Sequence, residues 1–446
     1  MRSFKGYLNE AASMAETNKV LKHIDHAEDF LRFGDEGYNH LHKSLSLLHG
    51  AMRGQRNEAS HGLTTKYDGS PSITFGYHPD TGRFFVSTKS LFNKDAKVNY
   101  TDADIERNHG HSPGLVKKLK AALQHLPKIA PHHKIMQGDL MYTRTKADND
   151  VTSDRSHHHF TPNTITYSVD RHSPEGKKVE KAKIGVALHT GYTGSIEDPR
   201  VEYNTDTGDI HHDPEVHVID HRMDLGKVNY PPAAQKKVKD HLQAAAELHK
   251  KHDFSHLDTV DANHLSTFTN MMSDQGHKMS YEGLRNHVEA KLQKKVDELK
   301  SDKGKAAATA KMHDTLSKME AHKENWQRYF DMHHHMQQAK HALMGPLNAA
   351  DYDFKHSIAG NHTNPEGHVL VINNTPLKLV DRQEFARKNR ERIREQQSYD
   401  PTIHLWGTPA ATIWALNLTP GQSPAKNHSN IVVAMNPFVN YQNAKK

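Results

Sequence analysis

The segment around Lys66 contains the residues of this sequence that are best suited to chemistry. It runs from Thr64 to Pro71 (TTKYDGSP) and lies between an expected helix and two β-type runs, residues 72–77 and 83–87. The Asp-Gly pair favours a tight reversal, which would leave the amine of Lys66 at the mouth of a sheet, where a lysine nucleophile can meet a substrate. On its own, the tetrapeptide KYDG is more typical of an ordinary exposed turn lysine.

Further segments with charged or aromatic residues follow Lys66 in chain order, each within or beside an expected strand. They are Ser87-Thr88-Lys89, Gln137-Gly138-Asp139-Leu140, Ile165-Thr166-Tyr167-Ser168-Val169-Asp170, Glu366-Gly367-His368-Val369 and Leu377-Lys378-Leu379-Val380. Taken singly, each has a structural explanation, since strand-end lysines, turn carboxylates and half-buried strand tyrosines are common. Their order after Lys66 favours a common site.

Together these segments resemble the collinear motifs of the covalent nucleotidyltransferases, the superfamily of ATP-dependent DNA ligases, RNA ligases and messenger RNA capping enzymes. The resemblance covers roughly residues 61–230 and 350–380. It implies an α+β fold, in which a mainly antiparallel β nucleotidyltransferase core of the ATP-grasp-like ligase adenylation type carries a large helical insertion and an N-terminal helical segment.

The resemblance also implies a reaction. Lys66 would attack the α-phosphorus of ATP, releasing pyrophosphate and leaving a lysyl-AMP phosphoramide, and GTP remains open as the donor. The amine must first lose its proton, and a free lysine has a pKa near 10.4. Lys89, Lys378 and a bound Mg²⁺ would disfavour the ammonium form and take up the charge that develops on the phosphate. Asp139 and Glu366 would supply the hard oxygen ligands that Mg²⁺ requires.

Three more residues receive binding roles from the same resemblance. Tyr167 would stack on the purine, and the backbone around Thr65 would read the edge of the base. Asp68 would orient Lys66 or bind the ribose.

The sequence departs from the family pattern in three places. Position 139 is Asp where the family usually has Glu, and Pro376 replaces one of the two lysines expected around Leu377. The 66 residues after Val380 are few for the oligonucleotide-binding barrel that DNA ligases and capping enzymes carry. An RNA-ligase-like member or a catalytically inactive branch is therefore favoured.

Hydrophobic periodicity and turn residues divide the chain. We expect a cleavable peptide at 1–10, N-terminal helices at 11–60, the nucleotidyltransferase core at 61–231 and 346–380, a helical insertion at 232–345, and a basic helix with a tail at 381–446. The insertion is expected to form a lid or partner-binding arm outside the core. Residues 1–10 resemble the head-targeting peptides of tailed phages, which a protease removes after a triplet such as Leu8-Asn9-Glu10; a frayed terminus is the alternative. The basic helix is expected to be solvated, with contact to a phosphate backbone as the alternative.

Composition excludes several classes of protein. The chain has 446 residues and no cysteine, so disulfides, thiolate metal sites and cysteine nucleophiles are excluded. No apolar run approaches the ~18–20 residues of a membrane span. Lys and Arg number 59 against 53 acidic residues, a mild excess that fits a phosphate-bearing partner but is shared by many proteins. The clusters within the 39 histidines, such as 157–159 and 333–335, lack the spacing of a defined metal site and are expected to be mostly solvated surface.

The sequence therefore predicts a phage-encoded, ATP- and Mg²⁺-dependent polynucleotide ligase that acts on RNA or DNA ends. The alternative is a virion-internal protein that keeps the fold as a nucleic-acid-binding or structural component without catalysis. Phage head components are expected partners in that case, and the protein would act in the host cytoplasm, the virion interior or both.

Overall fold

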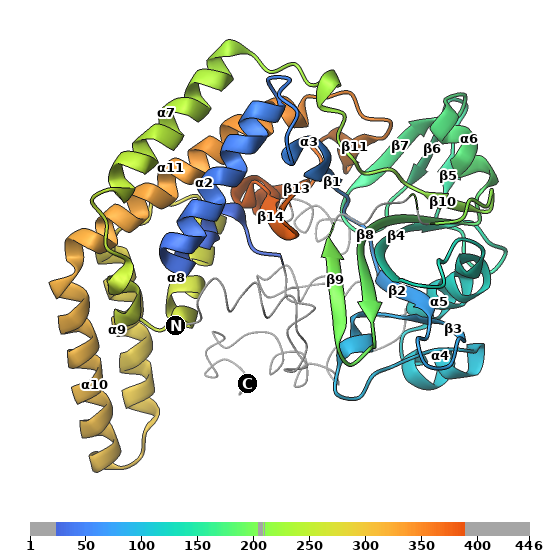
Figure 1. Ribbon diagram of the computed structural model, residues 1–446. Helices are drawn as coiled ribbons and strands as arrows, with labels where there is room; N and C mark the ends of the chain where they lie inside the picture. The colour runs from blue at the N-terminus through green and yellow to red at the C-terminus, as the bar shows by residue number, and fades with distance from the viewer. Residues whose placement is uncertain (1–23, 204–207, 209, 389–446) are drawn as a thin grey trace. The chain divides into compact units, whose positions relative to one another are not determined.

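The computed structural model describes residues 24–203, 208 and 210–388. The chain divides into two compact units, residues 1–381 and 382–446. The second unit, with most of the expected basic helix and tail, lies largely outside the described residues, as does the expected cleavable peptide. The first unit is an α+β structure in which three mainly antiparallel sheets accompany a long helical segment (Figure 1).

Helices open the described chain: the 3-10 helix η1 (Ala27–Phe33), α2 (Gly34–Ala51) and the short α3 (Ala59–Gly62). Gly34 marks the change from η1 to α2, and its φ of 73° is disfavoured for other residues. Gly37 lets α2 pack closely on η1, because a Cβ at this position would lie 2.0 Å from the carbonyl oxygen of Phe30.

The largest sheet has the strand order β10-β8-β4-β2-β3, with β9 paired to β8. Its strands are β2 (Ser72–Tyr77), β3 (Phe84–Ser87), β4 (Ile135–Thr143), β8 (Ile184–Gly194), β9 (Pro199–Tyr203) and β10 (Val216–Val218). All pairs are antiparallel except β10 with β8. Helices α4 (Asp102–His109) and α5 (Pro113–His125) contribute apolar residues to a cluster with this sheet. Helix α4 was not predicted, although Thr101 and Asp104 form a capping box at its start.

A three-stranded antiparallel sheet, β1-β13-β14, places Lys66 beside the start of β13. It comprises β1 (Leu63–Lys66), β13 (Gly367–Ile372) and β14 (Thr375–Leu379). Its register sets Lys66 opposite Gly367 and Lys378 opposite Val369. The turn between β13 and β14 uses Asn373 and Asn374, both with positive φ, as a two-residue hairpin turn requires.

The third sheet has the order β12-β11-β7-β6-β5. Its strands are β5 (Thr152–Ser153), β6 (His157–Phe160), β7 (Thr166–Asp170), β11 (Lys355–Ile358) and β12 (Asn361–His362), and helix α6 (Pro174–Lys181), not predicted from the sequence, follows β7. His158 in β6 is fully buried, and His333, in helix α11 (Lys323–Asn348), is also buried. The expectation that the histidine clusters are mostly solvated surface is therefore wrong for these two residues.

Residues 232–348 are mainly helical, and the last helix continues through Pro346, beyond the predicted end of the helical segment at residue 345. The α-helices are α7 (Pro232–His249), α8 (Ala262–Gln275), α9 (Tyr281–Glu298), α10 (Asp302–Ala321) and α11 (Lys323–Asn348). In the part of the chain that the structure describes, none of the helices is long and apolar enough to span a membrane.

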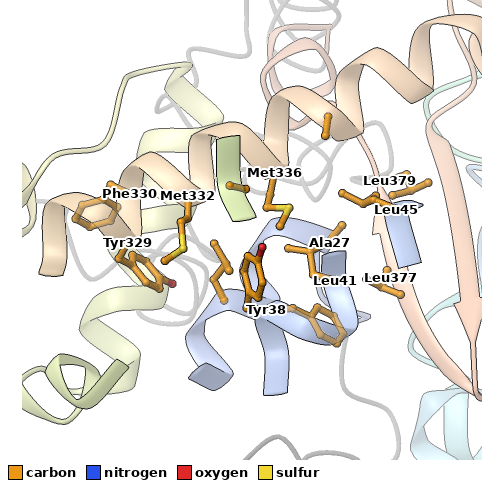
Figure 2. Close-up of a cluster of buried hydrophobic side chains, with 14 of the residues drawn as sticks. Ala27, Tyr38, Leu41, Leu45, Tyr329, Phe330, Met332, Met336, Leu377 and Leu379 are labelled. Atoms are coloured by element: carbon orange, nitrogen blue, oxygen red, sulfur yellow. The ribbon is translucent and has the colours of Figure 1, made fainter. Parts of the chain in front are cut away.

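The helical segment shares a hydrophobic cluster with the small sheet. Figure 2 shows side chains of α11, α2 and β14 within this cluster, among them Met336, Leu41 and Leu377. Leu370 and Ile372 of β13 belong to the same cluster as Trp326 of α11. The expectation of an arm outside the core is therefore wrong for this segment, because its longest helix packs on the sheet that holds Lys66.

Candidate functional site

Lys66 and Glu366 form an ion pair at the end of the β1-β13 pairing. The Lys66 Nζ donates a hydrogen bond to a carboxylate oxygen of Glu366. Their side chains are 25% and 13% exposed, so the pair lies at the rim of the interior. Burial by itself lowers the pKa of Lys66, but the carboxylates of Glu366 and Asp139 outweigh burial and raise this pKa above 10.5. In this form of the protein Lys66 is an ammonium ion at neutral pH.

Asp139 approaches Lys66 from β4 of the large sheet. Gly69 makes this approach possible, because a Cβ there would lie 2.5 Å from the Cβ of Asp139. Burial would raise the pKa of Asp139, but the ring of His189, whose Nε2 lies 3.8 Å from the carboxylate, and the charge of Lys66 lower it. The glycine of the Lys-Tyr-Asp-Gly segment therefore permits close packing of the loop on β4, and Asp139 stays ionised.

Asp68 anchors the loop after β1 rather than contacting Lys66 directly. Its carboxylate accepts hydrogen bonds from Asn163 Nδ2 (2.8 Å) and from the backbone N–H groups of Thr164 (2.7 Å) and Ile165 (3.1 Å). The side chain is buried, with 6% exposed. These bonds fix the loop that presents Lys66. The two predicted roles of Asp68, orienting Lys66 or binding the ribose, stay predictions.

Tyr167 is buried beneath that loop. Its side chain is 1% exposed, and its hydroxyl accepts a hydrogen bond of 2.7 Å from the backbone N–H of Asp68. The rings of Phe160, Tyr67 and His356 pack around it at centroid distances of 5.3–5.6 Å. The predicted stacking of Tyr167 on a purine is therefore wrong for this arrangement, because neighbouring rings already cover it.

The backbone of Thr65 is also engaged. Its N–H donates a hydrogen bond of 2.6 Å to the carbonyl of His221, and its hydroxyl points to the sulfur of Met223. This N–H is therefore not available to read a base, in contrast to the prediction.

The two remaining predicted lysines differ in position. Lys378 lies on β14, and its charge lowers the pKa of Glu366, so it belongs to the electrostatic surroundings of the ion pair. Lys89 is exposed at the start of the 3-10 helix η2 (Lys89–Phe92). Within residues 24–203, 208 and 210–388, no hydrogen bond or ion pair joins Lys89 to Lys66, Asp139 or Glu366.

Carboxylates outnumber ammonium groups next to Lys66. Asp68, Asp139 and Glu366 all raise its pKa. The pKa of Glu366 is itself raised, because burial and the charge of Asp68 outweigh the opposing charges of Lys66 and Lys378. A further cation at this position would be electrostatically favoured. Among the described residues, no group of three or more acidic or histidine side chains has the arrangement of a metal site.

A cavity of about 100 Å³ adjoins Lys66 and Asp139. Sites for drug-sized ligands are about 300–1,000 Å³, so this cavity has room for a ring system but not for a whole nucleotide. Its walls mix apolar and polar side chains: Ile24, Thr64, Thr65, Lys66, Tyr67, Asp139, Ala187, Leu188, His189, Thr190, Tyr203, His221, Val369 and Val371.

Residues 18–393 match a family described as "Family of unknown function (DUF6267)". The chain belongs to this family. No curated protein matches the chain, and no solved structure matches it.

In this member of the DUF6267 family, sequence reasoning missed His189 and His221, which line the cavity on β8 and just beyond β10. Single histidines carry little signal in a chain that has 39 of them. The only sequence feature near these histidines was a β-type run. Such a run predicts that side chains alternate between the two faces of a strand, but it does not say which face borders a cavity. Chemically, the site combines a lysine amine, two carboxylates that can hold a cation, and a partly apolar cavity beside them.

Proposed function

We propose that this protein is an ATP-dependent nucleotidyltransferase of the polynucleotide-ligase type, in which Lys66 carries the nucleotide. The observation that supports this best is the ion pair of Lys66 with Glu366, with Asp139 close by. A lysine and two carboxylates from segments far apart in the sequence lie near one another, in a chain whose motifs follow the ligase order. Nucleic acid ends are the proposed acceptors.

The proposed chemistry requires Lys66 to lose its proton. Asp139 and Glu366 are the residues that would hold Mg²⁺, which supplies positive charge against the phosphate oxygens. Once Glu366 is engaged away from Lys66, the main interaction that raises the pKa of this lysine is gone, and burial then lowers the pKa. The neutral Nζ forms a bond to the α-phosphorus while the bond from that phosphorus to the pyrophosphate oxygen breaks.

Lys66→Met tests the proposal directly. Incubation of the wild-type protein with α-labelled ATP and Mg²⁺ should give an acid-labile covalent adduct, and Lys66→Met should abolish it. Lys300→Met is the matched control, because Lys300 is exposed and does not line the cavity. An adduct that persists in Lys66→Met, or that Lys300→Met alone removes, contradicts the assignment of the nucleophile.

A second candidate is a virion-internal protein that keeps this fold without turnover. The small volume of the cavity and the ammonium form of Lys66 favour it. Mass spectrometry of purified virions tests this candidate. A copy that begins at Ala11 would support packaging with the head components, whereas absence from particles would support action in the host cytoplasm.

A further inference from the structure

His221 lines the cavity beside Lys66 with its hydrogen-bonding groups unused. Its residue is 5% exposed. Neither ring nitrogen forms a hydrogen bond of normal geometry with any described residue, although the Ile219 carbonyl is near enough to favour the charged ring slightly. Burial dominates and lowers the pKa of His221 to about 4. At neutral pH the ring is therefore uncharged and offers one N–H donor and one nitrogen acceptor.

A buried donor and acceptor without partners are costly, and native structures usually pair such groups. The other histidine of the cavity differs in this respect, since the Nδ1 of His189 lies 2.7 Å from the Thr190 hydroxyl. The ring of His221 therefore has a donor and an acceptor to offer a ligand in the cavity.

The backbone of His221 is held rigidly next to Lys66. Its carbonyl accepts the hydrogen bond from the N–H of Thr65, the residue that precedes Lys66 in β1. The backbone at His221 is therefore hydrogen-bonded to the strand that carries Lys66. A ligand that bonds to the ring of His221 would have a defined position relative to the Lys66 amine.

The other walls of the cavity restrict the chemistry of that ligand. Leu188, Val369 and Val371 offer apolar surface, which suits the faces of a planar ring. Without a bound cation, the carboxylates of Asp139 and Glu366 outnumber the charge of Lys66, so the cavity itself disfavours a bare anion such as phosphate. A flat, uncharged ring with hydrogen-bonding groups on its edge fits best.

We propose that His221 reads the nucleobase of the nucleoside triphosphate and decides which base is accepted. This inference rests on the proposed function, because it assumes a nucleotide at Lys66. The base enters the cavity edge-on to His221, while the ribose and phosphates lie outside it, toward Lys66 and Lys378. Discrimination arises because the fixed donor and acceptor of the imidazole match one base edge and leave unpaired groups against another.

Calorimetric binding of the α,β-methylene analogues of ATP and GTP tests the inference, since these analogues cannot transfer the nucleotide. The wild-type protein should prefer one base. His221→Ala should reduce this preference by about tenfold, the value of one net hydrogen bond. Binding of inorganic tripolyphosphate, which has no base, should not change. His221→Gln, which keeps a polar side chain if the alanine variant folds poorly, should change the ratio of the two affinities.

His158→Ala is the matched control, since His158 is also fully buried with an unpaired Nε2 but does not line the cavity; it should keep the base preference. An unchanged ATP-to-GTP ratio in both His221 variants, or an equal loss for tripolyphosphate, overturns the inference. If the adduct at Lys66 still forms in those variants, only the role of His221 fails. If the base preference depends on His221 but no adduct forms in any variant, the inference stands and the proposed reaction fails.

Discussion

Lys66 and Glu366 form an ion pair although 300 positions separate them in the chain. The pairing of β1 with β13 brings them together. Glu366 is the strongest of the carboxylates that raise the pKa of Lys66, so this carboxylate is the main group that favours the ammonium form of the amine.

Glu366→Gln should therefore lower the pKa of Lys66. The amide carries no charge, so burial and the remaining carboxylates decide the pKa, and burial favours the neutral amine. Acylation of Lys66, followed by mass spectrometry over a range of pH, should begin at lower pH in the variant than in the wild type. Lys89 in the same samples is the internal control and should react equally in both. If acylation of Lys66 begins at the same pH in Glu366→Gln as in the wild type, or at a higher pH, then Glu366 does not raise the pKa of Lys66.

The sequence predicts the strands around this site better than it predicts which strands pair. Alternation of apolar residues predicts strands such as β4 and β13, because the pattern is local. The contact of Lys66 with Glu366 depends on strand pairing across the whole chain, which periodicity does not encode. The order of the motifs suggested it only through a resemblance.

Tyr167 and His221 show the limit most clearly. Both lie in or beside strands, and a strand pattern does not say which face meets a core and which a cavity. Tyr167 is covered by aromatic rings from β6 and β11, whose packing on β7 is a tertiary property. His221 owes its unpaired ring to the surrounding walls, which come from β1, β8 and β13.

A buried ion pair fixes η1 to α11. The Lys340 Nζ donates hydrogen bonds to Glu28 Oε1 (2.9 Å) and to the carbonyl of Val380 (2.8 Å), and both side chains are almost fully buried. Lys340→Met should lower the free energy of unfolding by about 3–5 kcal/mol, because it leaves the Glu28 carboxylate buried without its cation. Urea denaturation measures this loss.

Two further variants test whether the unpaired charge of Glu28 causes the loss of stability in Lys340→Met. Adding Glu28→Gln to Lys340→Met should recover part of the loss, since the uncompensated charge is then removed. Lys318→Met breaks the exposed pair with Asp314 and should cost no more than ~1 kcal/mol. Equal losses for Lys340→Met and Lys318→Met would rule out a stabilising role for the buried pair.

Glu175 should make stability depend on pH in acid. Burial raises its pKa, but a hydrogen bond from His217 Nε2 (2.5 Å) and the ammonium of Lys178 outweigh burial and lower the pKa to about 2, from 4.5. Because the folded-state pKa is lowered, the stabilisation is complete above pH 4.5 and is lost as the pH falls toward 2. At ~1.4 kcal/mol per unit, the contribution at pH 7 is roughly 3 kcal/mol.

Glu175→Gln should therefore be less stable than the wild type at pH 7, and the difference should shrink between pH 4.5 and 2. Thermal or urea unfolding across this range measures it. Glu197→Gln, at an exposed glutamate, should follow the wild-type curve. A difference between wild type and Glu175→Gln that is constant with pH would exclude the ionised carboxylate as its source.

Two deletions should separate the parts of the helical segment that belong to the core from those that do not. In the hairpin of α9 and α10, residues 290–310 bury only Val296 among their side chains. Replacing them with a short glycine-containing turn should lower the free energy of unfolding by about 1–3 kcal/mol, the value of one buried valine, and leave cooperative unfolding intact. Deletion of residues 233–342 removes Trp326, Phe330 and Met336 from the cluster shared with β13 and β14, so the free energy of unfolding should fall by far more than in the short deletion. Circular dichroism during urea denaturation distinguishes the two cases. A long deletion that is as stable as the short one would show that the sheet carrying Lys66 does not depend on the helices, and that the cluster in Figure 2 is dispensable for it.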